Sequence, residues 1–403
     1  MHIGSVGRRI AYWREYRGLT QADFGRLMGQ SRRWVQDLEG GQRQSDPRLS
    51  LLQRAAEVLH VPLERLVSDP ATAMPADAPM PMPIEVAALA DALHHLPTAE
   101  PSGPPASTRA LHRRLDFVGH AWVACHYAAA ARELPGLLAD AHAAADSSAE
   151  GAVLLSRSYQ LAASLLYKYS GTSCTPGVLA ADRAFAAANQ AGDPVVIGAA
   201  ARRVARGLIH QRRHDAATQY ATTQADSLRT VLERAGTPGL STLGMLYLVA
   251  AVGASGGGRT PASVSTTTER LGAAAEVADQ QGDDEAGDFT AFGATNVALH
   301  EVDVLLRLDD AWAAVEAGRR ITPEQLAQLN RERQARHLIT SARALALTRK
   351  REEATSALVA AEKLAPEEVR RPSVITVVKE LLLLVPSPSG ELRGLAERCG
   401  LQA

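Results

Sequence analysis

The sequence predicts an all-α protein, and three features of the chain support that fold class. From about residue 108 to the end of the 403-residue chain, alanine and leucine recur at three- and four-residue spacing, which is the period of a helix. Brief turns that contain glycine and proline, at residues 192–194 and 236–238, interrupt this pattern. No stretch convincingly shows the alternation of apolar and polar side chains that is typical of a strand.

The proline content divides the chain into three predicted parts. Residues 70–83 and 97–107 are rich in proline and flank one short apolar pattern, from Ile84 to Leu96. We therefore expect a domain at residues 1–68, a linker with one short helix at residues 69–107, and a second domain at residues 108–403. Residues 1–68 hold eleven arginines against seven acidic side chains, although the whole chain has a formal net charge of −1. Positive charge is therefore concentrated in the amino-terminal domain.

The composition disfavours several classes of protein. The three cysteines, Cys125, Cys174 and Cys399, form no Cys-x-x-Cys pair, which argues against a structural zinc site or a disulfide framework. The amino terminus is polar, and the longest uncharged apolar run, Leu243 to Ala254, is too short to span a bilayer. We therefore expect a cytoplasmic protein that does not enter a membrane.

Capping signals predict two short helices within residues 19–40. Thr20 followed by Asp23 is a capping box that starts the first helix, and Gly29 ends it. Ser31 can then cap the second helix, so that a turn of about three residues joins the two. The pattern therefore predicts a helix-turn-helix arrangement.

The second of these helices is predicted to expose a basic and polar face. Residues advance by about 100° each around a helix, and Val35 and Leu38 form the buried edge. The side chains that point outward are Arg32, Arg33, Gln36 and Asp37, and Trp34 stands at the border. Arginine can bind guanine and glutamine can bind adenine in the major groove of DNA, so this face is predicted to read a DNA sequence. Trp34 could contact the flanking DNA backbone or pack at the edge of the core.

Residues 3–67 resemble the phage-repressor, or XRE-type, helix-turn-helix family. The match spans GRRIAYWREYRGLTQADFGRLMGQSRRWVQDLEGG and then PRLSLLQRAAEVLHVPLERL. The resemblance implies a five-helix, lambda-repressor-like DNA-binding domain whose third helix enters the groove. It also implies an ion pair between Arg14 and Glu39, and phosphate contacts from Gln21 and Arg43.

Asp37 departs from the family pattern, in which a polar or basic side chain often occupies this position. A carboxylate near DNA phosphates is repelled unless it accepts a hydrogen bond from cytosine or pairs with an arginine. Asp37 therefore either selects cytosine or is neutralised by Arg33. The sequence leaves both alternatives open.

In the second domain, residues 335–366 resemble the tetratricopeptide repeat (TPR), which is roughly 34 residues long. The residues that carry this match are Ala342, Ala354, Leu358, Ala361 and Pro366. Elsewhere the repeat is degenerate, and helix pairs are expected to start near residues 150, 193, 239, 289 and 331. The resemblance implies a TPR-like α-solenoid with a concave surface, which would serve as a sensor or dimerisation domain.

A helical array behind a DNA-binding module suggests a sensor for an effector, either a small molecule or a peptide, or a docking site for a protein partner. The domain order resembles that of the peptide-responsive RRNPP regulators, which clamp peptides with asparagines on successive inner helices. This chain has only three asparagines, Asn189, Asn296 and Asn330, which disfavours a peptide. The candidate ligand contacts are polar side chains in apolar helices, namely Tyr159, Tyr167, Arg202, Arg206, His210, Asn296 and His300. The inner arginines could instead be solvated, and the asparagine could bridge helices.

We expect neither catalysis nor a cofactor. Residues 253–260, GASGGGRT, nearly form a phosphate-binding P-loop, but Arg259 replaces the lysine and no strand is predicted before them. His210 and His214 have a spacing that can hold zinc on one helix, yet Gln211 stands where a metalloprotease needs glutamate, so no metal is expected.

The sequence therefore predicts a homodimeric transcriptional regulator that binds double-stranded DNA at an inverted-repeat operator. One alternative is an interaction scaffold whose amino-terminal module docks a protein rather than DNA. The other is a nucleotide hydrolase that uses residues 253–260.

Overall fold

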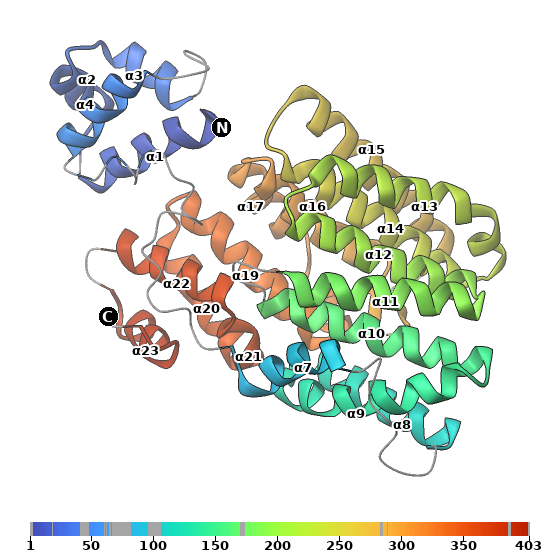
Figure 1. Cartoon of the computed structure of the whole chain (residues 1–403). Coiled ribbons are helices and arrows are strands. Elements are labelled where there is room, and N and C mark those ends of the chain that lie inside the picture. The colour runs from blue at the N-terminus through green and yellow to red at the C-terminus, as the bar shows by residue number, and fades with distance from the viewer. Residues whose placement is uncertain are drawn as a thin grey trace. The chain divides into compact units, whose positions relative to one another are not determined.

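The computed structural model of the chain describes residues 3–17, 19–40, 48–59, 61, 63, 66, 82–95, 106–169, 174–282, 285–287, 289–385 and 388–401. The chain forms two compact units, Met1–Met80 and Pro81–Ala403 (Figure 1). Nearly all of the regular structure in the described residues is helical, so the predicted all-α class is confirmed.

The first unit packs helices around a small apolar core. The described helices are α1 (Ile3–Tyr16), α2 (Gln21–Met28), α3 (Arg32–Glu39) and α4 (Leu49–Leu59). Ile10 of α1, Phe24 of α2, Val35 of α3 and Leu59 of α4 are all fully buried in this core. The fifth helix that the family resemblance implies falls mostly outside the described residues, as does Arg43.

The second unit contains the remaining helices and one pair of strands. Its first half comprises α7 (Ile84–His95), α8 (Thr108–Val123), α9 (Tyr127–Ala145), α10 (Ala149–Tyr169), α11 (Thr175–Ala191), α12 (Pro194–His210), α13 (His214–Arg234), α14 (Thr237–Gly256) and α15 (Pro261–Gln281). Its second half comprises β1 (Glu285–Gly287), β2 (Thr290–Phe292), α16 (Ala294–Arg307), α17 (Ala311–Arg319), α18 (Pro323–Gln328), α19 (Arg331–Leu347), α20 (Arg351–Leu364), α21 (Pro366–Val369), α22 (Pro372–Leu384) and α23 (Gly390–Arg398).

The helices of the second unit stack as antiparallel pairs. In the series α8, α10, α12, α14, α16 and α19, each member packs against the next. Each member also packs against the helix that follows it in sequence, as the green and gold helices of Figure 1 show. This is the nearest-neighbour packing of a helical repeat protein. The first and last members of the series, α8 and α19, also contact each other, so the array curls back on itself.

A two-stranded hairpin interrupts the array between α15 and α16. Its strands pair antiparallel, with Ala286 opposite Ala291, and the hairpin packs against α14 and α16. The sequence predicted no strand here, because strands of three residues are too short to show alternation. The hairpin also places the start of α16 at Ala294, whereas a helix pair was expected to begin near residue 289.

Two apolar helices of the second unit pack against its other helices. The short helix predicted between the proline-rich segments is α7, and it packs against α9 with Val86, Leu89 and Leu93 fully buried. In the described part of the chain, α14 is the one helix long and apolar enough to cross a membrane by length and composition. Most of this stretch is buried, and α14 packs against α12, α13 and α15, as a core helix does.

Candidate nucleic-acid interface

Side-chain caps fix the junction between α2 and α3. The Thr20 hydroxyl accepts a hydrogen bond from the Asp23 amide at 3.1 Å, and the Asp23 carboxylate accepts from the Thr20 amide at 3.3 Å. Hydrogen bonds from Thr20 lower the pKa of the Asp23 carboxyl. Gly29 ends α2 in the left-handed region at a φ of 69°, and Ser31 then caps α3 by accepting from the Trp34 amide at 3.1 Å. The predicted helix-turn-helix junction is therefore present.

The third helix turns its polar side outward. Val35 and Leu38 are buried in the core, whereas Arg32, Arg33 and Gln36 are exposed. Asp37 and Trp34 are half-buried, and Trp34 packs against the core of the first unit. The orientation predicted for Arg33 and Gln36 is therefore found, and Trp34 contributes to the edge of the core.

A buried ion pair joins α1 to α3. Arg14 donates from Nε to Glu39 Oε1 at 2.5 Å and from Nη2 to Glu39 Oε2 at 2.9 Å, so the contact is bidentate. The two side chains are only 6% and 7% exposed. Arg14 also donates to the Leu19 carbonyl at 2.8 Å, at the entry to α2. The pair that the family resemblance implies is present, and it fixes the end of α3 against α1.

The Glu39 carboxylate also binds α2. Gln21 is half-buried, and its Nε2 donates to Glu39 Oε2 at 2.9 Å. One carboxylate therefore connects the first three helices. The phosphate contact predicted for Gln21 stays a prediction, and it has to coexist with this hydrogen bond. The phosphate contact predicted for Arg43 lies outside the described residues.

Residues 5–67 match a family described as a helix-turn-helix domain. No curated protein matches the chain. The family match covers the same segment in which the capped junction, the outward face of α3 and the buried ion pair occur. Residues 5–67 therefore form a helix-turn-helix domain, and this class of domain binds DNA.

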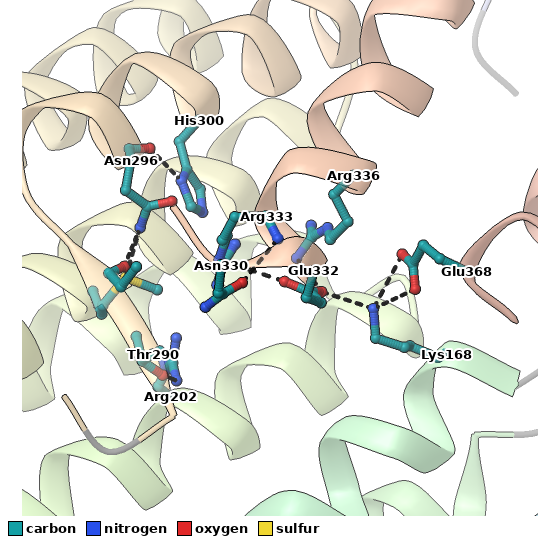
Figure 2. Close-up of polar contacts among 12 residues, drawn as sticks. Lys168, Arg202, Thr290, Asn296, His300, Asn330, Glu332, Arg333, Arg336 and Glu368 are labelled. Atoms are coloured by element: carbon teal, nitrogen blue, oxygen red, sulfur yellow. Dashed lines mark hydrogen bonds and ion pairs between the residues drawn. The ribbon is translucent and has the colours of Figure 1, made fainter. Parts of the chain in front are cut away.

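In the second unit, several candidate ligand residues hold the hairpin to the array (Figure 2). Arg202 donates from Nη2 to the Thr290 hydroxyl at 3.0 Å. Asn296 is fully buried, and its Nδ2 donates to the Ala291 carbonyl at 2.7 Å. His300 Nδ1 lies 2.8 Å from the Asn296 carbonyl, and burial lowers the pKa of this histidine to about 3. These contacts give Arg202 and Asn296 a structural function that the sequence did not show.

The two candidate tyrosines contact different parts of the array. Tyr159 is buried, and its hydroxyl lies 2.7 Å from Nε2 of His142 on α9. Tyr167 is also buried, and its hydroxyl donates to the Arg203 carbonyl on α12 at 3.2 Å. Its ring stacks on that of His210, with the ring centroids 4.7 Å apart. The structure therefore does not bring Tyr159 and Tyr167 to one shared surface.

Two further sequence motifs lie at the junctions of consecutive helices. Gly256 ends α14, Thr260 caps α15, and Arg259 between them pairs with Asp310 at 2.9 Å, so residues 253–260 connect two helices. A P-loop instead follows a strand. His210 ends α12 and His214 begins α13, so the two histidines do not share one helix as a zinc pair with that spacing would.

Charged side chains that the sequence analysis did not single out act on Arg206 of α12. They come from two other helices and are Asp303 and Arg307 of α16, and Arg333 and Arg336 of α19. Glu332 of α19, which pairs with Lys168 of α10, lies beside Arg333 and Arg336. On α16 the signal that could have revealed Asp303 and Arg307 is their spacing of four in an otherwise apolar segment, whereas on α19 it is a run rich in charged residues, 331–336. Their convergence could not be predicted, because it depends on the way the array curls.

The ion pair between α1 and α3 should dominate the stability of the first unit. We expect Arg14→Met to lower its free energy of unfolding by about 3–5 kcal/mol, because the Glu39 carboxylate is left buried without its cation. The double variant Arg14→Met/Glu39→Leu should recover much of this loss. Urea-dependent hydrogen exchange of α1–α3 amides in the full-length protein measures the free energy of unfolding of both variants.

The matched control is Arg26→Met. Arg26 pairs with Asp23 at 2.7 Å, but its side chain is 78% exposed. Its loss should therefore change the free energy of unfolding by less than about 1 kcal/mol. Equal effects of Arg14→Met and Arg26→Met would show that the pair with Glu39 does not hold α3 in place.

Proposed function

We propose that the protein is a sequence-specific transcriptional regulator of the XRE type that acts in the cytoplasm. The observation that carries this proposal is the orientation of α3 within the helix-turn-helix domain. Arg33 and Gln36 are exposed on a helix whose opposite side is fixed in the core by Val35 and Leu38. Guanidinium and amide groups presented in this way can form paired hydrogen bonds with guanine and adenine in the major groove.

Contacts to phosphate would set the position of α3 on the duplex. Arg32 is exposed in the first turn of α3, where the helix dipole is positive and favours an anion. We assign Gln21 and Arg43 to the same task, as the family resemblance implies. Such contacts fix the register of the domain on the duplex but carry no sequence information. We therefore assign the preference for an operator to Arg33, Gln36 and Asp37.

The helical array supplies the regulatory part of the proposal. Its stacked antiparallel helix pairs resemble TPR repeats, which present extended surfaces for binding. We propose that this unit binds an effector or docks a partner, and that it performs no catalysis. Residues 253–260 end α14 and lead into α15, whereas a P-loop follows a strand, and this argues against nucleotide hydrolysis there.

Substitutions on α3 should remove sequence preference. We expect Arg33→Ala and Gln36→Ala each to weaken binding to the preferred duplex by about 5- to 150-fold, because each change removes a base contact worth roughly 1–3 kcal/mol. Binding to unrelated duplexes should change much less. Fluorescence anisotropy of fragments selected from genomic DNA by the full-length protein measures both affinities.

Arg54→Ala is the matched control. Arg54 is exposed on α4, and its substitution removes the same positive charge as Arg33→Ala does. It should leave the ratio of specific to nonspecific affinity unchanged. For the unaltered protein, the logarithm of the DNA affinity should fall linearly with the logarithm of salt concentration, since counterions are released. An affinity for DNA that does not depend on salt, with no loss in Arg33→Ala, would instead favour the scaffold whose amino-terminal module docks a protein.

We also propose that the regulator binds its operator as a homodimer. One α3 covers only a small half-site, and modules of this kind usually bind two half-sites about 34 Å apart on the duplex. Sedimentation of the full-length protein at micromolar concentration should therefore give the mass of a dimer, and the complex with operator should contain two chains. A single chain in both conditions would contradict this proposal.

A further inference from the structure

Arg206 lies among other cations without a carboxylate of its own. In the described part of the chain, no acidic side chain comes within ion-pair distance of its guanidinium. Among the charged groups that act on it, Arg336 and Arg307 come first, Asp303 opposes them, and Arg333 adds a smaller unfavourable effect. Burial and these neighbouring arginines lower the pKa of Arg206 to about 9. The position therefore disfavours the positive charge that Arg206 carries.

The nearby carboxylates are already bound by other cations. Lys168 binds both Glu332 and Glu368 (Figure 2). Its Nζ lies 2.7 Å from Glu332 Oε1 and 2.9 Å from Glu368 Oε2. Arg371 also reaches Glu368, at 2.6 Å, and Tyr127 donates to the same carboxylate at 2.5 Å. Glu332 and Glu368 are therefore already bound by other side chains.

The arginines near Arg206 share their carboxylates with other cations. Glu332, Asp303 and Glu368 raise the pKa of Arg336 despite its burial, whereas burial lowers the pKa of Arg333. Arg333 and Arg336 approach the Glu332 carboxylate only to 3.6 and 3.8 Å, whereas Lys168 lies 2.7 Å from it. Arg307 binds Asp303 at 2.9 Å through Nε, which leaves the donors of its terminal nitrogens for other acceptors. We call Arg206, Arg307, Arg333 and Arg336 the arginine cluster. Its four positive charges outnumber the three carboxylates that act on it among the described residues, Asp303, Glu332 and Glu368.

Neighbouring histidines respond to the same excess of positive charge. Desolvation of the ring, and then Arg206 and Arg307, lower the pKa of His210 to about 4, although part of this residue is exposed. Neither His210 nor His300 is therefore protonated at neutral pH. The cluster remains open to solvent, because the side chains of Arg307 and Arg336 are 33% and 30% exposed. A dissolved anion can therefore reach it.

We propose that the arginine cluster is a binding site for a small, multiply charged oxyanion, held by Arg206 together with Arg307 and Arg336. Three arginines from α12, α16 and α19 offer planar groups of donors that match carboxylate or phosphate oxygens. An anion here would supply the negative partner that Arg206 lacks. It would also connect α12, α16 and α19, which are members of the helix series. We also propose that this anion is the effector of the regulator, and this second part rests on the proposed function.

The test uses the full-length protein with pyrophosphate and with citrate as probes, at constant ionic strength. Isothermal titration calorimetry should show binding of one of the two probes, and that probe should also raise the melting temperature. Stronger binding of pyrophosphate identifies a phosphorylated ligand, and stronger binding of citrate identifies a polycarboxylate. Absence of binding by both at millimolar concentration would overturn the proposed site.

Two substitutions separate this site from a purely structural arginine. Arg206→Met and Arg336→Met should each weaken binding of the probe by about tenfold or more, since each removes charge-assisted hydrogen bonds. Arg234→Met, at an exposed position at the end of α13, should not. Without the probe, Arg206→Met should melt at the same temperature as the unaltered protein or higher, because it removes an unpaired charge. Unchanged probe binding in Arg206→Met, or a lower melting temperature without the probe, would overturn the assignment.

The effector function has its own readout. The probe should change the affinity of the unaltered protein for its selected duplex, and Arg206→Met should bind that duplex without responding to the probe. If the probe binds through Arg206 but leaves DNA affinity unchanged, the site stands and its function as the effector site is wrong. If the protein binds no DNA while the probe still binds through Arg206, the proposed regulator is wrong and the anion site stands.

Discussion

The ion pair between Arg14 and Glu39 is the constraint on which the DNA-binding surface depends. An eight-residue helix such as α3 is too short to be stable alone, so its orientation has to come from tertiary contacts. Val35 and Leu38 provide the apolar part of these contacts. The bidentate pair also restricts orientation, because its two hydrogen bonds fix the angle between α3 and α1. Gln21 extends the same restraint to α2, so the first three helices form one rigid support for the exposed side chains.

Both units contain a buried ion pair, but the second unit also contains a half-buried arginine that has no ion pair among the described residues. In the first unit, Arg14 and Glu39 neutralise each other, and their contact excludes solvent. In the second unit, Arg206 has neighbours of its own sign, and the nearby carboxylates serve other cations. A paired buried charge holds a structure together, whereas an unpaired one is a cost that a bound anion would relieve. The paired charge therefore supports the surface that is proposed to read DNA, and the half-buried Arg206 lies where the protein is proposed to sense a ligand.

Local features of the fold could be predicted from the sequence, and features that depend on distant segments could not. The cap at Thr20, the end of α2 at Gly29 and the starts of most helix pairs follow from residues close in the chain. The hairpin was missed because its short strands are stabilised by contacts with α14 and α16 rather than by a pattern of their own. For the same reason, the link from Arg202 to Thr290 appeared only in the structure. The sequence predicted Arg206 as a candidate from its helical spacing. It could not predict the neighbouring arginines, because they approach Arg206 only through the curl of the array.

Chemical protection of the operator tests the central claim, that α3 lies in the major groove with Arg33 on a base edge. Methylation of guanine N7 occurs in that groove, and arginine binds guanine through the same atom. The full-length protein should protect a guanine N7 in each half-site, and Arg33→Ala should expose that guanine while the phosphate footprint stays in place. A bound operator whose major-groove guanines all react as in free DNA would contradict the account.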